Sequence, residues 1–212
     1  MTSEARQDRL IKRKEEILAE ATKLFASDGY ARAKVDDLAA RLGVGKGTIY
    51  RYFPTKEELF LSVADKAMEN LQNAINNAAL RLDDPFDKIS AAIEAYLAFF
   101  ETNMNLVEIF VHERAEFKDR KTPTYLTYRD KNIKNLEAVL AKMKTDGLVR
   151  KIDVPATASI LGDLLYGTVY THLLRGGGRK LSKLTPRIVD VFFNGILTPA
   201  GQSARNHSNG NT

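Results

Sequence analysis

The chain has 212 residues, 44% hydrophobic and 28% charged, the composition of an ordinary globular protein with one large or two small domains. It contains no Cys, which excludes a disulfide framework, a cysteine-based zinc site, an iron–sulfur cluster and a cysteine nucleophile. The net charge is +5, and residues 1–56 hold most of the excess, with 12 Lys and Arg against 8 Asp and Glu. This distribution favours a polyanionic partner, with nucleic acid as the first candidate and an acidic membrane as the second.

The N-terminus is polar and charged, and no apolar run approaches the roughly 18 residues of a membrane span. We therefore expect a cytoplasmic protein without a membrane segment. Helical periodicity runs through the whole chain, and no segment alternates cleanly enough to be a strand. The sequence predicts an all-α fold of about nine helices without an internal repeat.

Residues 1–55 are predicted to form a small domain of three helices. An apolar stripe marks the first helix, which ends at Asp28-Gly29, where Gly suits the position after a helix C-terminus. The second helix is expected over 35–42 and the third from Lys46 to about Phe53, where Pro54 stops it. Two short helices joined by a glycine-containing turn indicate a helix-turn-helix unit.

The third helix has a single apolar seam, formed by Ile49 and Phe53. Its remaining surface carries hydrogen-bond donors, an aromatic pair and a glycine that permits close approach, which are the groups that contact phosphates and base edges in a major groove. Lys56 adds a cation at the start of the next helix, beside backbone N–H groups that themselves favour phosphate.

A second domain is predicted over residues 56–198, and helix 56–80, which begins with the capping box Thr55-x-x-Glu58, connects the two domains. Asp83-Asp84-Pro85 marks a boundary after this helix. Further helices are expected over about 85–101, 103–117, 123–145, 155–174 and 186–197. Residues 199–212 are small and polar, and we expect them to be a disordered tail.

The stretch from Gly29-Tyr30 to Lys56-x-x-Leu59-Phe60 closely resembles the DNA-binding domain of TetR-family repressors. The resemblance covers roughly residues 10–62 and includes Val35-x-x-Leu38-Ala39, Leu42-Gly43-Val44 and Gly47-Thr48-Ile49-Tyr50-Arg51-Tyr52-Phe53. It implies a regulator that binds double-stranded DNA and is released from it by a small-molecule effector. The rest of the chain fits the family only in length and in helix count.

The resemblance also implies roles for single residues. Lys46, Gly47 and Arg51 occupy positions that face bases in the family, and Thr48, Tyr50, Tyr52 and Lys56 occupy positions that usually hold phosphates. Two departures affect the caps. Ala33-Lys34 stands where a Thr cap is common, and Gly45 stands where Ser is frequent. Gly is a tolerable N-cap, so the recognition helix is still expected to form.

TetR-like regulators form dimers through their last two helices, here 155–174 and 186–197. Helix 155–174 is apolar almost all round and needs cover on both sides. Gly162 and Gly167 permit a close approach by the partner subunit, although packing within one chain would use them equally well. A two-fold dimer presents two recognition helices to successive major grooves, which predicts a homodimer on a palindromic operator.

The effector site is expected in the second domain, with an apolar or aromatic small molecule as the ligand. The candidate lining residues are Tyr96, Phe100, Met104, His112, Tyr128 and Tyr166. Residues of these types more often occupy ordinary core positions, and a histidine such as His112 is more often hydrogen-bonded or at the surface. His112 and Glu116 lie one helical turn apart, but two ligands do not make a metal site. We expect neither a metal nor another cofactor.

Other classes of protein fit the chain less well. An enzyme is not expected, because the sequence lacks Gly-x-Ser-x-Gly, His-Glu-x-x-His and a phosphate loop, and Gly176-Gly177-Gly178 has no Gly-Lys-Ser/Thr ending. A module that binds a membrane through its basic N-terminus would need a broad apolar face, and the motif from Gly47 to Phe53 argues against it. The expected mechanism is a population shift, with repression as its sign and helix 56–80 as the lever between domains.

Overall fold

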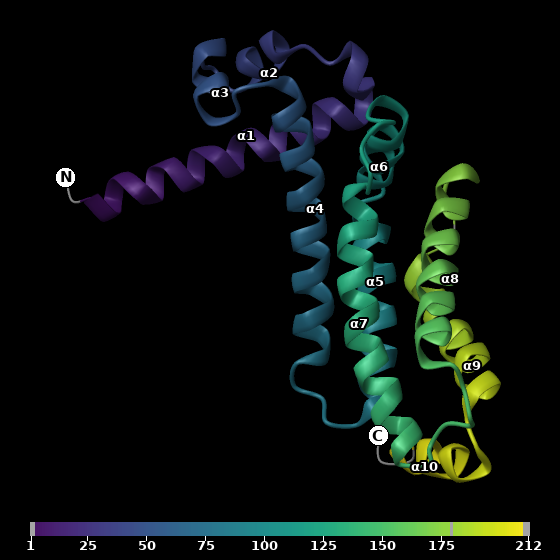
Figure 1. Ribbon diagram of the computed structural model, residues 1–212. Helices are drawn as coiled ribbons and strands as arrows, with labels where there is room; N and C mark the ends of the chain where they lie inside the picture. Colours follow the sequence, from purple (N-terminus) through teal and green to yellow (C-terminus); the bar gives the residue numbers. More distant parts are fainter. Residues whose placement is uncertain (1–2, 179, 210–212) are drawn as a thin grey trace. The chain divides into compact units, whose positions relative to one another are not determined.

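The computed structural model describes residues 3–178 and 180–209, and these residues form an all-α protein (Figure 1). The helices are α1 (Ser3–Arg32), α2 (Val35–Arg41), α3 (Lys46–Tyr52), α4 (Lys56–Ala79), α5 (Pro85–Thr102), α6 (Asn105–Glu116), α7 (Thr124–Thr145), α8 (Val154–Leu174), the 3-10 turn η1 (Leu181–Leu184), α9 (Thr185–Ile196) and α10 (Pro199–Asn209). The predicted fold class is confirmed. Within the described ranges, none of the helices has both the length and the apolar character needed to cross a membrane.

The chain divides into two compact units, and each is discontinuous in sequence. The first contains Met1–Glu69 and Met104–Tyr125, and the second contains Asn70–Asn103 and Leu126–Thr212. The second domain predicted from the sequence includes residues 104–125. In the structure α6 packs against α1 and therefore groups with the N-terminal helices.

The first unit is built on α1, which packs against α2 and α6. Helix α1 starts at Ser3, well before the apolar stripe that begins at Leu10, and it passes through a kink at Gly29 (φ 71°, ψ 170°) to end at Arg32. Directly after the kink, the centroid of the Tyr30 ring lies 5.3 Å from that of the Phe60 ring and 4.9 Å from that of the Phe117 ring. These rings join the end of α1, the start of α4 and the residue that follows α6.

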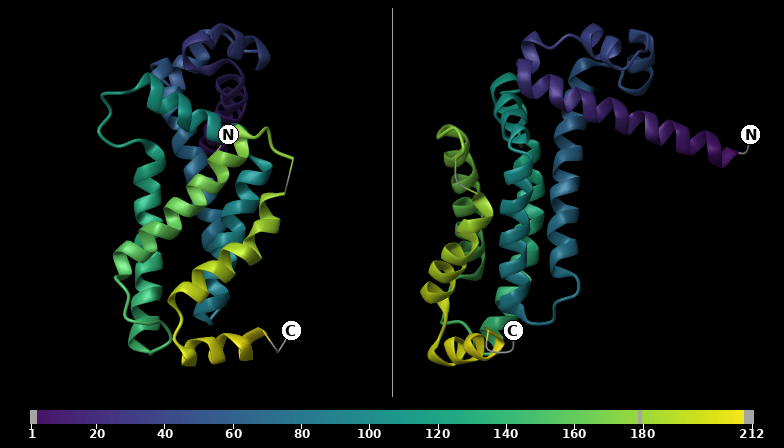
Figure 2. Two further views of the ribbon diagram at one scale, coloured as in Figure 1. Left: turned by 90° about the vertical axis from the view of Figure 1, so that its right-hand side faces the viewer. Right: turned by 180° about the vertical axis from the view of Figure 1, so that it is seen from behind.

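The second unit has α5 at its centre, in contact with α8, η1 and α9, and Figure 2 shows α8 and α9 as a layer on one side of α5. The predicted boundary marker is the N-cap of α5, because the Asp84 carboxylate accepts hydrogen bonds from the backbone N–H groups of Phe86 (2.8 Å) and Asp87 (3.0 Å), with Pro85 in the first turn. At the other end of α5, the Glu101 carboxylate accepts hydrogen bonds from the N–H and the hydroxyl of Ser182, both at 2.8 Å. These bonds lower the pKa of Glu101.

The expectation of a disordered tail is wrong for residues 199–209, which form α10, and residues 210–212 lie outside the described part of the chain. Thr198 caps the helix by accepting a hydrogen bond from the N–H of Gly201 (3.0 Å), and Pro199 follows the cap. The Arg205 guanidinium lies over the Phe193 ring, 5.2 Å from its centroid. Composition alone suggested disorder, but the cap and this contact with α9 supply the stabilisation that an isolated short helix lacks.

Candidate nucleic-acid interface

The turn between α2 and α3 has the backbone geometry of a tight helix-turn-helix. The N–H of Gly43 donates to the Ala40 carbonyl (3.1 Å), and the N–H of Val44 donates to the Ala39 carbonyl (3.0 Å). Gly43 has a φ of 62°, the left-handed conformation that Gly adopts at no steric cost. Gly45 then serves as an extended N-cap of α3 without a side-chain cap bond, as expected from the missing Ser.

Helix α3 buries very little of its own surface. Ile49 is its one buried residue, at 1% exposure, and Phe53 directly after the helix is also buried. Lys46, Gly47 and Arg51 are exposed, and Thr48, Tyr50 and Tyr52 are half-buried. The two apolar anchors hold the helix on the domain and leave the predicted DNA-binding residues at the surface. A helix with this division can lay its outer face in a major groove.

Several of these side chains are held by neighbours within the first unit. The Lys46 ammonium donates a hydrogen bond to the Asp36 carboxylate at 2.7 Å, which raises the pKa of Lys46, and it lies 6.0 Å from the centroid of the Tyr50 ring. The Arg51 guanidinium lies 5.5 Å from the centroid of the Tyr52 ring. Such exposed pairs contribute little to stability, but they restrict where the cations point.

Lys56, in the first turn of α4, is half-buried. Its ammonium lies 4.6 Å from the centroid of the Tyr30 ring and 3.4 Å from the Ala31 carbonyl oxygen, to which it donates a hydrogen bond. Burial lowers the pKa of Lys56, and the charge of Glu116 opposes that effect. The capping box predicted at this helix start is present in part, because the Thr55 hydroxyl accepts a hydrogen bond from the Glu58 N–H at 3.0 Å.

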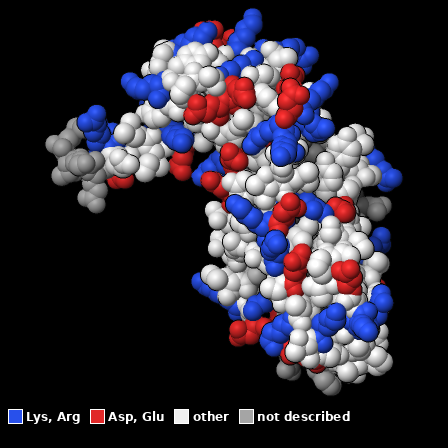
Figure 3. Space-filling view, viewed as in Figure 1, with Lys and Arg blue, Asp and Glu red and all other residues white. Residues whose placement is uncertain are grey.

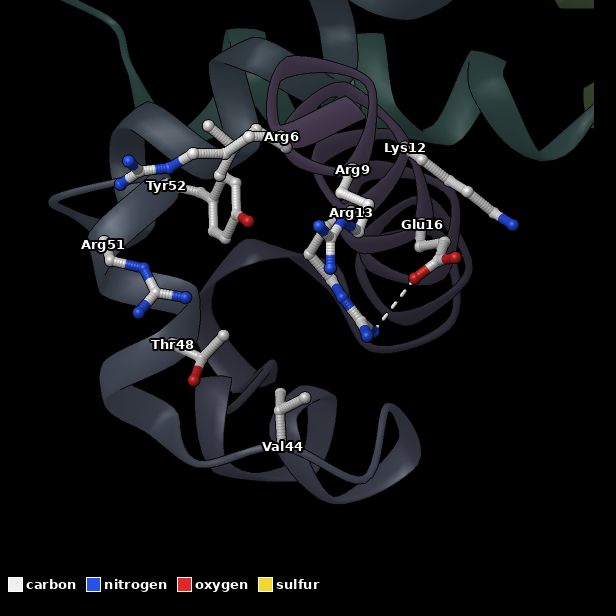
Figure 4. Close-up of a pocket in the computed structure, with 10 residues that line it drawn as sticks. Arg6, Arg9, Lys12, Arg13, Glu16, Val44, Thr48, Arg51 and Tyr52 are labelled. Carbon is white, nitrogen blue, oxygen red and sulfur yellow. Dashed lines mark ion pairs between the residues drawn. The ribbon is translucent and has the colours of Figure 1, made fainter. Parts of the chain in front are cut away.

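A basic groove lies between the N-terminal part of α1 and α3, with a volume of about 580 Å³ (Figure 4). Its lining is Arg6, Arg9, Leu10, Lys12, Arg13, Glu16, Val44, Thr48, Arg51 and Tyr52. No role is predicted from the sequence for the three arginines of α1, although their i, i+3, i+7 spacing places them on one helical face. The net charge of the N-terminal quarter was the signal that could have identified them.

The helix-turn-helix of the first unit is similar in sequence to known regulatory proteins. Residues 17–63 match the family model described as bacterial regulatory proteins, tetR family. The chain is 34% identical over 89 residues to the HTH-type transcriptional activator FasR of Mycolicibacterium smegmatis. The match covers 42% of this chain and 41% of FasR, so it spans about two fifths of that relative. The TetR family transcriptional regulator PfmR of Thermus thermophilus is 26% identical with a TM-score of 0.70, over 84% of this chain and 97% of PfmR.

Residues 17–63 therefore carry the helix-turn-helix domain of the TetR family. A third similarity concerns the fold alone. The transcriptional regulator FadR of Bacillus subtilis, whose structure is a complex with stearoyl-CoA, has a TM-score of 0.71 at 18% identity, over 85% of this chain and 98% of FadR.

The six candidate effector residues are distributed over both compact units. Tyr96 and Phe100 lie in the second unit with ring centroids 5.1 Å apart, and Phe100 is 1% exposed. Tyr166 on α8 is 41% exposed and stacks on Tyr170. Tyr128 is half-buried, with the Lys131 ammonium 5.0 Å from its ring centroid. Tyr96 and Phe100 are thus ring neighbours within α5.

The other two candidates, Met104 and His112, lie in the first unit. The His112 ring packs against the kink of α1, where a Cβ added to Gly29 would lie 3.0 Å from its Cε1 atom. Glu113 beside it is 1% exposed, and its carboxylate accepts hydrogen bonds from Arg120 (2.7 Å) and from the N–H and hydroxyl of Thr124 (2.9 Å each). His112 therefore packs within the first unit, against α1.

Proposed function

We propose that this TetR-family regulator is a homodimeric repressor that binds a palindromic operator through α3 and leaves it when an apolar or aromatic small molecule binds the second unit. The observation that carries the DNA-binding half of the proposal is the surface of α3. This helix is seven residues long, buries only Ile49 and presents cations and hydroxyl groups on its remaining surface. The assigned roles are base contacts for Lys46, Gly47 and Arg51 and phosphate contacts for Thr48, Tyr50, Tyr52 and Lys56.

The homodimer is supported by apolar side chains that a single chain leaves uncovered. On α8, Ile160 is 66% exposed and Leu164 is 41% exposed, and on α9, Val191 is 69% exposed. Large apolar side chains gathered on two helices favour a partner surface over solvent.

The two glycines of α8 differ in how much space surrounds them. A Cβ at Gly162 would meet Arg129 and Ile133 of the same chain at 3.3 Å, whereas no atom of the described residues lies within 4 Å of one at Gly167. Gly167 is thus the glycine open to a partner helix.

The effector class is inferred from the composition of the second unit. Tyr96, Phe100 and their neighbour Phe99 form an aromatic cluster on α5, with Phe99 and Phe100 ring centroids 5.4 Å apart. Such surroundings favour a lipophilic or aromatic molecule over a charged one. The FadR structure is a complex with stearoyl-CoA, and the apolar acyl chain of that ligand agrees with this class. Tyr128 and Tyr166 stay candidates for the polar contact.

Signal transmission requires a state in which the recognition helices no longer match the operator, and the effector shifts the population towards it by binding it more tightly. Helix α4 runs from the first unit into the second, with the division after Glu69, and is one candidate lever. Helix α6 is another, because it packs on α1 while the chain before residue 104 and after residue 125 belongs to the second unit. We propose that both helices carry the change.

Selection of genomic DNA fragments by the purified protein tests the proposal. We expect a two-fold-symmetric sequence to be enriched by the wild type and lost in a Tyr50→Ala, Lys56→Ala double variant. Lys134→Ala, an exposed lysine on α7, serves as the control and should select the same sequence. Failure of the folded wild type to enrich any duplex would contradict a DNA-binding role.

Transcription from a promoter carrying the selected site then gives the sign of regulation. Repression predicts that expression rises when the protein is removed and that an added effector has the same effect. Lower expression on removal would identify an activator instead, as FasR is named.

A further inference from the structure

The N-terminal part of α1 carries a concentration of positive charge that the helix-turn-helix does not use. Residues 5–14 contain Arg6, Arg9, Lys12, Arg13 and Lys14 against the single acid Asp8. All ten residues lie in α1. Figure 3 shows Lys and Arg side chains along α1 and around the outer rim of the helix-turn-helix, with acidic side chains between them.

The groove between α1 and α3 joins this charge to the proposed recognition surface. Five of its ten lining residues are Arg or Lys, and one is acidic. That acid, Glu16, is already paired with Arg13 at 2.9 Å. Figure 4 shows Arg13 and Arg51 extending towards the space between the two helices, whereas Lys12 points away from it. The groove therefore has a net positive charge contributed by two helices of the same compact unit.

We propose that Arg6, Arg9 and Arg13 form a second phosphate-binding surface, which holds the DNA backbone beside the segment that α3 reads. The proposal rests on the proposed DNA-binding function and extends its contact surface to α1. Three observations carry it. The arginines share one helical face, they line one groove with Thr48, Arg51 and Tyr52, and the local charge is strongly positive.

The dimensions agree with a backbone contact. Arg6 and Arg13 are separated by about 10 Å along the helix at a rise of about 1.5 Å per residue. One DNA strand carries a phosphate about every 3.4 Å along the axis, so the three guanidinium groups can face separate phosphates. Guanidinium groups bind phosphate oxygens in a bidentate manner, which suits arginine to this role. Contacts of this kind position the protein and add affinity without reading the sequence.

An acidic membrane is a weaker partner for the same charges. The exposed apolar side chains of this segment are Leu10 and Ile11, at 42% and 51% exposure. Leu10 already lines the groove with the arginines. Membrane binding by a helix needs a broad apolar face opposite its cations, and two residues do not provide one.

The test is an Arg6→Gln, Arg9→Gln, Arg13→Gln variant of the full chain. Its binding is measured by fluorescence anisotropy on a duplex carrying the selected operator and on a random duplex of equal length, over a range of salt concentrations. Lys134→Gln, Lys142→Gln, Lys151→Gln, which removes the same charge from exposed positions of the second unit, is the matched control. Circular dichroism and thermal unfolding establish that each variant is folded.

We expect the arginine-to-glutamine variant to bind both duplexes about tenfold more weakly or worse near 0.1 M salt, with the slope of log K against log salt reduced by about 2 to 3. The lysine control should keep the wild-type slope. An Arg6→Lys, Arg9→Lys, Arg13→Lys variant should retain most of the affinity, because the charges remain.

Wild-type affinity and slope in the glutamine variant would overturn the proposal while leaving the role of α3 intact. Equal weakness of the lysine-substituted and glutamine variants would overturn the electrostatic explanation. Loss of binding to phosphatidylglycerol vesicles, with DNA binding unchanged, would assign the segment to a membrane instead. Absence of wild-type binding to any duplex would contradict the proposed function itself, and so the two failures are distinguishable.

Discussion

Gly29 is a single residue on which the geometry of the first unit depends. Its φ of 71° and ψ of 170° fall in a region that is essentially restricted to Gly, because an L side chain clashes with its own backbone there. The His112 ring occupies the space where a side chain would lie. The kink and the packing of α6 on α1 therefore both require the absence of a Cβ atom at this position.

We predict that Gly29→Ala lowers the free energy of unfolding by about 1–3 kcal/mol, the cost of the backbone strain and of displacing His112. Thermal and urea unfolding measure the effect. Gly47→Ala is the control, because nothing lies within 4 Å of a Cβ at that helical position. It should be neutral or stabilising by up to about 1 kcal/mol. Equal stability of the Gly29→Ala variant and the wild type would contradict the role assigned to the kink.

At the level of elements, α10 shows how a short polar helix is held in place. Gly201 packs so closely on the chain before α8 that an added Cβ would overlap the Leu148 carbonyl oxygen. The Thr198 hydroxyl donates a hydrogen bond to the Gly147 carbonyl at 2.9 Å, and Arg205 contacts Phe193 on α9. Helix α10 is thus attached at its start and near its middle to other parts of the second unit.

We predict that Gly201→Ala forces α10 away from Leu148. The expected result is faster amide hydrogen exchange over residues 199–209 and a loss of about 1–3 kcal/mol of stability from the overpacked contact. Gln202→Ala changes an exposed neighbour and should leave both quantities near their wild-type values. Unchanged exchange in the Gly201 variant would show that the helix does not depend on this close contact.

At the level of the whole molecule, the proposed dimer gives a prediction that needs no knowledge of the operator. Val191→Asp places a charge on the exposed apolar surface of α9, and two-fold symmetry places a second charge on the partner. Burial of both costs enough to raise the dimer dissociation constant at least about 30-fold. Sedimentation velocity measures this change, with Leu80→Asp, 77% exposed beyond the end of α4, as the control. An intact dimer in the Val191 variant would contradict the proposed interface.

The helix-turn-helix could be predicted from the sequence because its determinants are local. Gly43 sets the turn, Pro54 follows the end of α3, and Thr55 caps the next helix. Long-range contacts could not be predicted in this way. The packing of His112 on Gly29 joins residues far apart in the chain, and periodicity gives no information about which helix a face will meet. The same limit applies to the effector candidates, which divide between the two units.

The sparse anchoring of α3 also bears on how such a protein diversifies. Since Ile49 is its one buried side chain, the outward-facing positions can be exchanged for other residues at a cost within about 0.5 kcal/mol each. The operator sequence that the protein prefers can therefore change during evolution with little effect on its folding. Duplicated copies of the gene could acquire separate target sites by stepwise substitution, each intermediate still a folded protein.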